Sequence, residues 1–289
     1  MYAFGRRIPR FVQVGISLQM HLPGVRWLVS ERRERIEPVC GADVWQTIAE
    51  TVQQRNRALS GEWLHFSSQW DKQRSSFLGL DAGGEPELFL TIESLDSRSR
   101  EPMLPASSYR VPVCRYSIRH GSWSVREFEP LPQFHRPARW DPERIRQVAA
   151  DVSRTLEGTF ERPQNVPPHW LPMHGDLVPW NLREDQRGQL WLLDWEDAGW
   201  GPPFADLFRF MVAHHSLGWG NPARIAARVR SALAAESDEA LQEVTAFWLK
   251  HRNFRPAPNT QDWRRQKARD AARGAREFAA LRVLARGVG

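Results

Sequence analysis

The chain has 289 residues, of which 41% are hydrophobic and 26% charged, with 40 Lys and Arg against 34 Asp and Glu. This length suits one large domain or two lobes, and the absence of an apolar run near the ~20 residues of a membrane span favours a globular protein. Two cysteines are too few for a disulfide framework and no apolar signal core follows the first residues, so a reducing cytoplasm is the expected location.

The formal net charge of +6 comes almost wholly from arginine, because Lys72, Lys250 and Lys267 are the only lysines. A basic surface attracts anions such as nucleotides, phosphorylated substrates, acidic peptides or nucleic acid. A codon composition that favours arginine would produce the same surplus, so the charge alone does not choose a partner.

The first half of the chain predicts a mainly antiparallel sheet with one helix. Loose alternation of apolar and polar residues predicts a strand pair at 11–20 and 25–30. Apolar residues at helical spacing predict a helix from Asp43 to Leu59, with Asp43 as its N-cap. Prolines and serines predict a loop over 95–108. Further short strands are predicted at 62–67, 75–80, 87–93, 110–118 and 123–128.

A proline-rich connector follows the last of these strands. Pro130, Pro132 and Pro137 stiffen it, and we predict a domain boundary there, between a lobe of residues 1–128 and a lobe of residues 129–289.

The second half predicts helices. Asp141 precedes Pro142 and an early acid, which is typical of an N-capped helix start, and Gly158 ends that helix. Apolar periodicity predicts further helices beginning at Leu207 and over 222–233, 238–249 and 261–286.

The densest functional pattern lies between residues 171 and 206. Short apolar runs lead into Asp176 and into Asp194, which places carboxylates where strands or tight loops open onto a cleft. The turn at 184–188 has hairpin composition, so the two acids are expected close together. With Asn181 they suit phosphoryl transfer to a hydroxyl: one carboxylate orients the hydroxyl and accepts its proton, while oxygen ligands hold Mg²⁺ on the nucleotide phosphates.

The stretch from Leu171 to Leu207 resembles the aminoglycoside phosphotransferase and choline kinase family, whose catalytic loop reads H-G-D-x-x-x-x-N and whose metal-binding acid follows on the next hairpin. The resemblance implies an α+β, two-lobed, protein-kinase-like fold with an antiparallel-sheet N-lobe and a mainly helical C-lobe. It implies ATP or GTP with Mg²⁺ as cofactors. It also implies that Asp176 is the catalytic base and that Asn181 and Asp194 bind Mg²⁺.

Five further residues receive roles from the same resemblance. His174 and Asp206 would hold the catalytic loop, although a histidine in such a loop is also typical of simple backbone hydrogen bonding. Glu196 would either support or bind the metal, or be an ordinary solvated acid. Backbone groups from about Glu129 to Leu131 would pair with the adenine edge.

The chain departs from the family in its N-lobe. The family's third strand carries a lysine that grips the nucleotide phosphates, and Thr91 is nearest that position here. A neutral hydroxyl cannot replace a cation against developing phosphate charge. The helix that would offer a glutamate partner is also missing from the predicted elements. Lys72 or Arg74 would compensate by reaching in from the preceding loop, or else both are exposed loop charges.

Charge in the second half bears on the acceptor. From Leu207 onward the chain has fifteen Lys and Arg against seven Asp and Glu. Polycationic aminoglycosides want carboxylates around them, so a neutral sugar, an anionic metabolite or a peptide hydroxyl fits better. Nucleic acid is disfavoured, because Asp270 and Glu277 interrupt the basic residues of the last helix.

The predicted function is ATP- and Mg²⁺-dependent transfer of the γ-phosphate to a hydroxyl of a small molecule. Two alternatives stay open. One is a pseudokinase that binds nucleotide or a partner without transfer, which the missing lysine and glutamate favour. The other is a kinase that acts on Ser or Thr of a peptide.

Overall fold

The structure is a computed structural model that describes residues 2–3, 38–67, 74–95, 104–132, 135–159, 161–195, 197–217, 221–251 and 264–286. The strand pair predicted at 11–20 and 25–30 lies outside these residues, as do Lys72 and Glu196. The chain divides into two compact units, Met1–Ser99 with Pro112–Arg136 and Arg100–Val111 with Pro137–Gly289. The boundary between residues 128 and 129 stays a prediction. None of the described helices combines the length and the apolar character that a membrane crossing requires.

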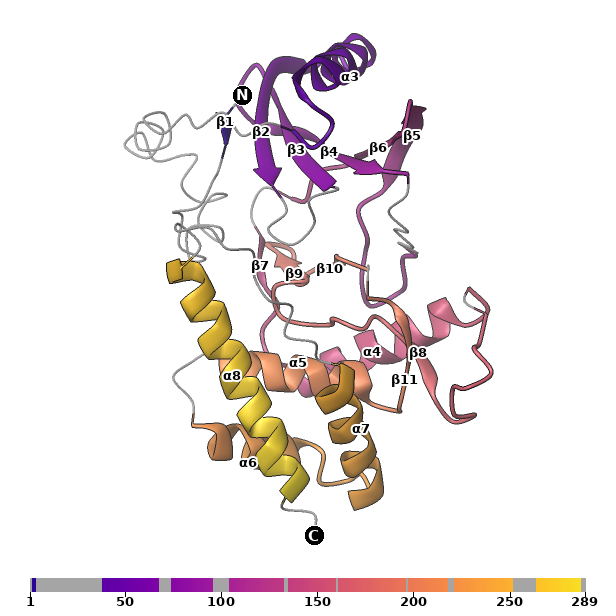
Figure 1. Cartoon of the computed structure of the whole chain (residues 1–289), viewed down its shortest axis with the longest axis vertical. Coiled ribbons are helices and arrows are strands. Elements are labelled where there is room, and N and C mark those ends of the chain that lie inside the picture. Colours follow the sequence, from indigo (N-terminus) through magenta and orange to yellow (C-terminus); the bar gives the residue numbers. More distant parts are fainter. Residues whose placement is uncertain are drawn as a thin grey trace. The chain divides into compact units, whose positions relative to one another are not determined.

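The first unit is built on a sheet whose described strands follow the order β1-β2-β3-β4-β6-β5 (Figure 1). Its neighbours pair antiparallel except β1 and β2, which are parallel. The predicted antiparallel sheet is therefore confirmed. The bounds are Tyr2–Ala3 (β1), Leu59–Ser67 (β2), Arg74–Asp81 (β3), Pro86–Ser94 (β4), Cys114–His120 (β5) and Trp123–Phe128 (β6).

One helix, α3 (Ala42–Arg55), covers one face of this sheet. Trp45, Ile48 and Val52 are buried on it and share a core with the inward residues of β2, β3, β4 and β6. The helix prediction is confirmed, but its ends were wrong. Gly41, at φ 80°, takes the N-cap position without a side-chain cap, and Asp43 lies in the first turn. An acid there still interacts favourably with the helix dipole.

The predicted strand at 110–118 and the predicted loop at 95–108 both include residues of the second unit. β5 begins at Cys114 and not at Arg110, because Arg110 instead forms a parallel bridge with Trp191 inside the second unit. The described part of the predicted loop at 95–108 contains neither helix nor strand.

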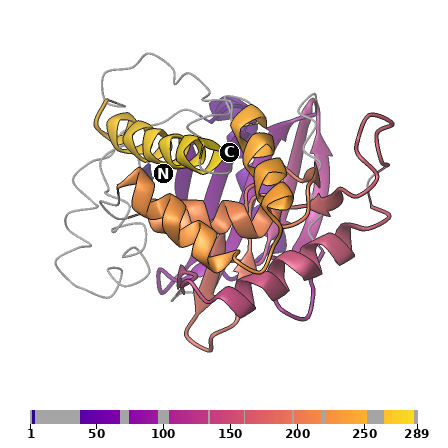
Figure 2. The same cartoon turned by 90° about the horizontal axis from the view of Figure 1, so that it is seen from below.

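The second unit is mainly helical (Figures 1 and 2). Its central helix, α5, contacts each of the other described helices of the unit. Two small sheets in the orders β10-β9-β7 and β11-β8 accompany the helices. The α+β fold class, with a sheet first and helices after, is confirmed. The helices are Pro142–Leu156 (α4), Ala205–Ser216 (α5), Pro222–Ala232 (α6), Asp238–His251 (α7) and Arg264–Arg286 (α8). The strands are His135–Pro137 (β7), Leu171–Met173 (β8), Leu182–Asp185 (β9), Leu190–Leu192 (β10) and Gly199–Gly201 (β11).

The start of α4 follows the local rules that predicted it. Asp141 caps the helix by accepting a hydrogen bond from the backbone of Arg144 at 3.2 Å, and proline occupies the first turn. The predicted core face is buried against the helices of the same unit. This unit therefore has its own core, and the loops between β8 and β11 are fixed on it.

Candidate active site

The loop after β8 is held by one buried carboxylate. Asp206, in the first turn of α5, accepts hydrogen bonds from the backbone N–H groups of His174 at 2.7 Å and Gly175 at 3.1 Å. Gly175 has φ 82°, and a Cβ there would lie 2.0 Å from the backbone oxygen of Asp197. Glycine is therefore required at this turn for its backbone conformation and for space.

His174 links this loop to the end of β10. Its Nε2 lies 2.9 Å from the carbonyl oxygen of Leu193, and its Nδ1 accepts the backbone N–H of Asp176 at 3.3 Å. The side chain is fully buried. The backbone N–H of Leu193 in turn donates to the carbonyl of Asn181 at 2.9 Å. The loop and the end of the hairpin are thus fixed to each other through the residue that precedes Asp194.

Burial shifts the protonation of both buried side chains. Burial lowers the pKa of His174 to about 4, against the opposing effects of the Asp176 charge and the hydrogen bond to Leu193. Burial raises the pKa of the Asp206 carboxyl to about 7, although the two backbone N–H donors lower it. Both shifts favour the neutral form, which is the form that an apolar environment tolerates.

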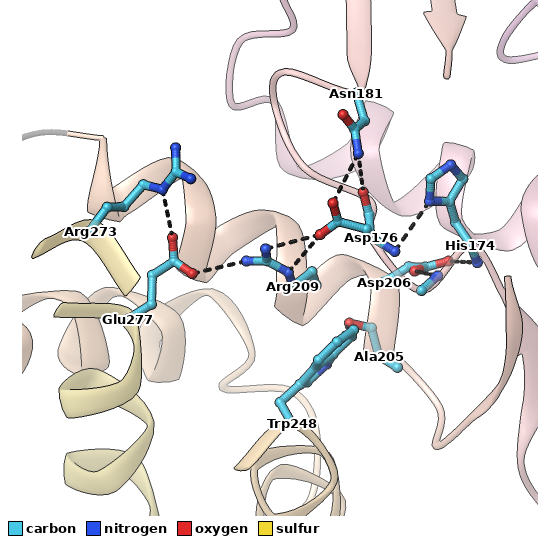
Figure 3. A network of polar contacts seen from close by, with 10 residues as sticks. His174, Asp176, Asn181, Ala205, Asp206, Arg209, Trp248, Arg273 and Glu277 are labelled. Atoms are coloured by element: carbon cyan, nitrogen blue, oxygen red, sulfur yellow. Dashed lines mark hydrogen bonds and ion pairs between the residues drawn. The ribbon is translucent and has the colours of Figure 1, made fainter. Parts of the chain in front are cut away.

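The carboxylate of Asp176 is held from two sides (Figure 3). Oδ1 accepts from Arg209 Nε at 3.2 Å and from Arg209 Nη2 at 3.0 Å. Oδ2 accepts from Asn181 Nδ2 at 3.0 Å, and the same amide nitrogen lies 3.1 Å from the Asp176 carbonyl oxygen. The Asp176 side chain remains 26% exposed. A carboxylate that is fixed yet open to solvent suits a group that must meet a substrate hydroxyl.

Arg209 continues the network into the C-terminal helix. Its Nη1 donates to Glu277 of α8 at 3.1 Å, and Glu277 is fully buried. Arg273 forms an ion pair with Glu277 at 3.5 Å and places its guanidinium 4.1 Å from the ring centroid of Trp180. Burial alone lowers the pKa of Arg209, but the charges of Asp176 and Glu277 raise it overall, so the guanidinium stays charged.

The two predicted metal ligands are linked through the backbone, because the N–H of Leu193, the residue before Asp194, donates to the carbonyl of Asn181. Asn181 is buried and directs its Nδ2 to Asp176, which leaves its amide oxygen as the ligand atom. Asp194 is exposed two residues after the end of β10 and adopts φ 63°, a left-handed conformation in which non-glycine residues are uncommon. Among the described residues, no group of three or more His, Cys, Asp or Glu side chains forms a metal cage.

The predicted nucleotide-binding residues that the structure describes lie in the first unit. Arg74 opens β3, and Thr91 lies in the middle of β4, fully buried. Within the described part of the chain, the Thr91 hydroxyl has no hydrogen-bond partner. Glu129 follows β6 and pairs through its backbone N–H with the carbonyl of Val113 at 3.0 Å. Leu131 is half-buried beyond it.

An unpredicted ion pair lies on the same face of the sheet as Thr91. Arg126 of β6 is the direct cross-strand neighbour of Thr91, and its Nη2 lies 2.5 Å from Oε1 of Glu93. Residues two apart on a strand share a face, so Thr91, Glu93 and Arg126 all lie opposite the core that α3 covers. The period-two alternation of β4 and β6 places these charges, but the strand register that joins them could not be read from sequence.

Arg209 and Glu277 were also missed. The only local signal was a charged residue inside each apolar helical stretch, Arg209 between Phe208 and Phe210, and Glu277 beside Phe278. Such residues are expected to be paired when buried. Their partners are far away in the sequence, so the pattern alone could not identify them.

Part of the chain is similar to a known protein family. The phosphotransferase enzyme family matches residues 110–248. No curated protein matches the chain.

Several solved structures show a remote likeness. Amicoumacin kinase hAmiN, in complex with AMP-PNP, Ca²⁺ and Ami, is 13% identical with a TM-score of 0.44, over 79% of this chain and 92% of that one. Aminoglycoside phosphotransferase APH(3'')-Id from Streptomyces rimosus, in complex with ADP and streptomycin, is 14% identical with a TM-score of 0.44, over 83% and 98%. A choline/ethanolamine kinase family protein from Mesorhizobium loti is 15% identical with a TM-score of 0.36, over 84% and 100%.

Proposed function

We propose that the chain transfers the γ-phosphate of ATP or GTP to a hydroxyl of a small molecule, and the match of residues 110–248 to the phosphotransferase enzyme family supports this. The observation that carries the proposal is the Asp176 carboxylate, which two neighbours orient while a quarter of its side chain stays exposed. A carboxylate so placed can accept a hydrogen bond from an acceptor hydroxyl and then take its proton.

The residues for a metal fit Mg²⁺ by their chemistry. Asn181 offers an amide oxygen because its nitrogen is committed to Asp176, and Asp194 offers a carboxylate. Mg²⁺ prefers oxygen ligands and is usually bound by one or two protein groups plus phosphates and water, so a two-residue site is sufficient. When bound there, Mg²⁺ would neutralise charge on the nucleotide phosphates. His174 and Asp206 would keep Asn181 and Asp194 in place, and Glu129 to Leu131 would seat the adenine.

The acceptor that we propose is neutral or anionic. The arginine surplus of the C-terminal helices disfavours a polycation, because its charges would repel rather than attract one. The described cysteines, Cys40 and Cys114, are unpaired, which is typical of a reducing cytoplasm.

A second candidate function has its own supporting observation. Thr91 is the residue nearest the position where the family is expected to have a lysine, and its hydroxyl cannot supply positive charge. This favours a pseudokinase that binds nucleotide without transfer. A peptide Ser or Thr acceptor is a variant of the first proposal, and the same assay separates it.

The test measures transfer of labelled phosphate from ATP and GTP to sugars, anionic metabolites, peptides and water. Asp176→Asn is expected to lower turnover by about 10²–10⁴-fold, the contribution of a general base. Asp194→Asn is expected to abolish Mg²⁺-dependent nucleotide binding in calorimetry. Asparagine tolerates the left-handed backbone that Asp194 adopts, so this change removes the charge without adding strain.

The matched control is Asp238→Asn, which removes an exposed carboxylate from the first turn of α7. Its turnover should equal that of the wild type. Nucleotide binding without transfer to any acceptor, water included, would favour the pseudokinase. Wild-type turnover in Asp176→Asn would refute the catalytic assignment.

A further inference from the structure

We infer that Arg209 is a positioning residue: it fixes the carboxylate of Asp176 and makes the C-terminal helix α8 part of the active site through Glu277 (Figure 3). The inference rests on the proposed phosphotransfer, in which Asp176 meets the acceptor hydroxyl. It concerns residues that lie outside the H-G-D-x-x-x-x-N pattern.

The two carboxylate oxygens of Asp176 have different hydrogen-bond partners. Arg209 directs both Nε and Nη2 to Oδ1, while Oδ2 receives a single side-chain donor from Asn181. An ionised carboxylate oxygen accepts about two hydrogen bonds. The described contacts therefore fill Oδ1 and leave one acceptor position on Oδ2. Oδ2 is then the atom that would receive the hydroxyl proton.

The side chain of Arg209 is itself held in place by its neighbours. Its side chain is only 9% exposed, its Nη1 is held by Glu277, and its Cζ lies 5.9 Å from the ring centroid of Trp248. Trp248 is fixed in turn, because its indole N–H donates to the carbonyl of Ala205 at 3.1 Å. A planar guanidinium that is held at both ends and packed on a fixed ring has one orientation available. Its two hydrogen bonds therefore hold Asp176 Oδ1 in one position.

Two side chains of α8 contact the residues around Asp176. Glu277 holds Arg209, and Arg273, one turn earlier on the same helix, packs over Trp180 in the catalytic loop. Trp180 directly precedes Asn181, the other residue that orients Asp176. Helix α8 therefore contacts Arg209, which holds Oδ1, and Trp180, the neighbour of the residue that holds Oδ2.

Stability alone is a poor reason for this arrangement. Removing charges from water is costly, and replacing a buried ion pair with apolar residues of similar size is often neutral or stabilising. Placing two arginines and two acids in and around a buried position costs more desolvation free energy than an apolar contact between α5 and α8 would. Orientation of Asp176 is the property that an apolar contact could not supply.

The test uses a double variant, Arg209→Met with Glu277→Met, which removes both buried charges together and puts unbranched apolar side chains in their place. We expect the urea midpoint and the KM for nucleotide to stay at wild-type values, while kcat for transfer to water or to an acceptor falls by about 10²-fold, as expected for a misplaced reacting group. In a crystal structure of this variant, the Asp176 carboxylate should leave its wild-type rotamer. The control is Arg282→Met, an exposed arginine of α8 that lies over Phe278.

An unchanged kcat, or an unchanged Asp176 rotamer, would overturn the inference. If the double variant does not fold, Arg209→Lys keeps the charge but loses the two-nitrogen contact with Oδ1, and it should show the same fall in kcat at normal stability. A wild-type protein that transfers phosphate to no acceptor would refute the proposed function instead. The rotamer of Asp176 in the double variant would still decide the role of Arg209.

Discussion

His174 Nε2 lies 2.9 Å from the carbonyl oxygen of Leu193, and this contact fixes the proton on the imidazole ring. A carbonyl oxygen only accepts, so Nε2 must carry a proton. Nδ1 accepts the backbone N–H of Asp176, so it must have a free lone pair. The ring is therefore neutral and held in one tautomer. A proton added to Nδ1 would break the contact that shapes the backbone at Asp176.

The first prediction is that His174 and Asp206 give opposite pH dependences of stability. The pKa of His174 is lowered to about 4, so between pH 6.5 and 4 the unfolded chain binds a proton that the folded chain does not, and stability falls as the pH falls. The pKa of Asp206 is raised to about 7, so between pH 3.8 and 7 the folded chain holds a proton that the unfolded chain releases, and stability falls as the pH rises.

Single variants separate these two contributions. In Asp206→Asn only the contribution of His174 remains, so the free energy of unfolding should increase from pH 4 to 6.5 more steeply than in the wild type. In His174→Gln only the contribution of Asp206 remains, so the free energy of unfolding should decrease as the pH rises toward 7. Each change in slope is at most about 1.4 kcal/mol per pH unit, the value for one proton. The measurement is urea unfolding at half-unit pH steps. Slopes that match the wild type in both variants would contradict the neutral assignments.

The second prediction compares two glycines with the same backbone conformation. Gly175 has φ 82° and Gly188 has φ 77°, but a Cβ on Gly175 would meet the backbone oxygen of Asp197 at 2.0 Å while a Cβ on Gly188 meets nothing within 4 Å. Gly188→Ala should lower the free energy of unfolding by about 1 kcal/mol, the strain of a left-handed alanine. Gly175→Ala should lower it by several times as much and displace Asp176. Equal losses in denaturant unfolding would mean that the loop yields to the new methyl group.

The third prediction concerns the cation that would face the phosphates of a nucleotide in the proposed function. Lys72 and Arg74 were the candidates from sequence, and the register of β4 and β6 adds Arg126 opposite Thr91. We expect Arg126→Met to weaken nucleotide binding by roughly 10–100-fold, as expected when a hydrogen bond to a charged group is lost. Calorimetric titration of ATP and GTP into Lys72→Ala, Arg74→Met and Arg126→Met would measure this.

Arg115→Met is the control for charge alone, because Arg115 is exposed on the neighbouring strand β5. A loss confined to Lys72→Ala would assign the cation to the preceding loop and leave Arg126 as the partner of Glu93. Equal binding by all the variants would favour a nucleotide site without a cation from this sheet.

Local patterns predicted most elements well. The start of α4 needs only Asp141 and Pro142, and both act within one turn, so its boundary was read correctly. The ends of α3 were less accurate, because Asp43 is a good cap by type but Gly41 makes the turn that precedes the helix. Arg110 looked like a strand residue by alternation, and its strand partner lies eighty-one residues away at Trp191.

The sequence by itself determined the order and spacing of His174, Asp176, Asn181 and Asp194, on which the proposed phosphotransfer rests, because those residues lie within one loop and one hairpin. Only the tertiary structure decided which groups hold them. Arg209 lies 33 residues after Asp176, and Glu277 lies 68 residues after Arg209. Their meeting depends on how α5 packs against α8, and a helical periodicity gives the buried face of each helix without giving its partner. The register that brings Arg126 beside Thr91 is likewise a property of paired strands, which no single strand encodes.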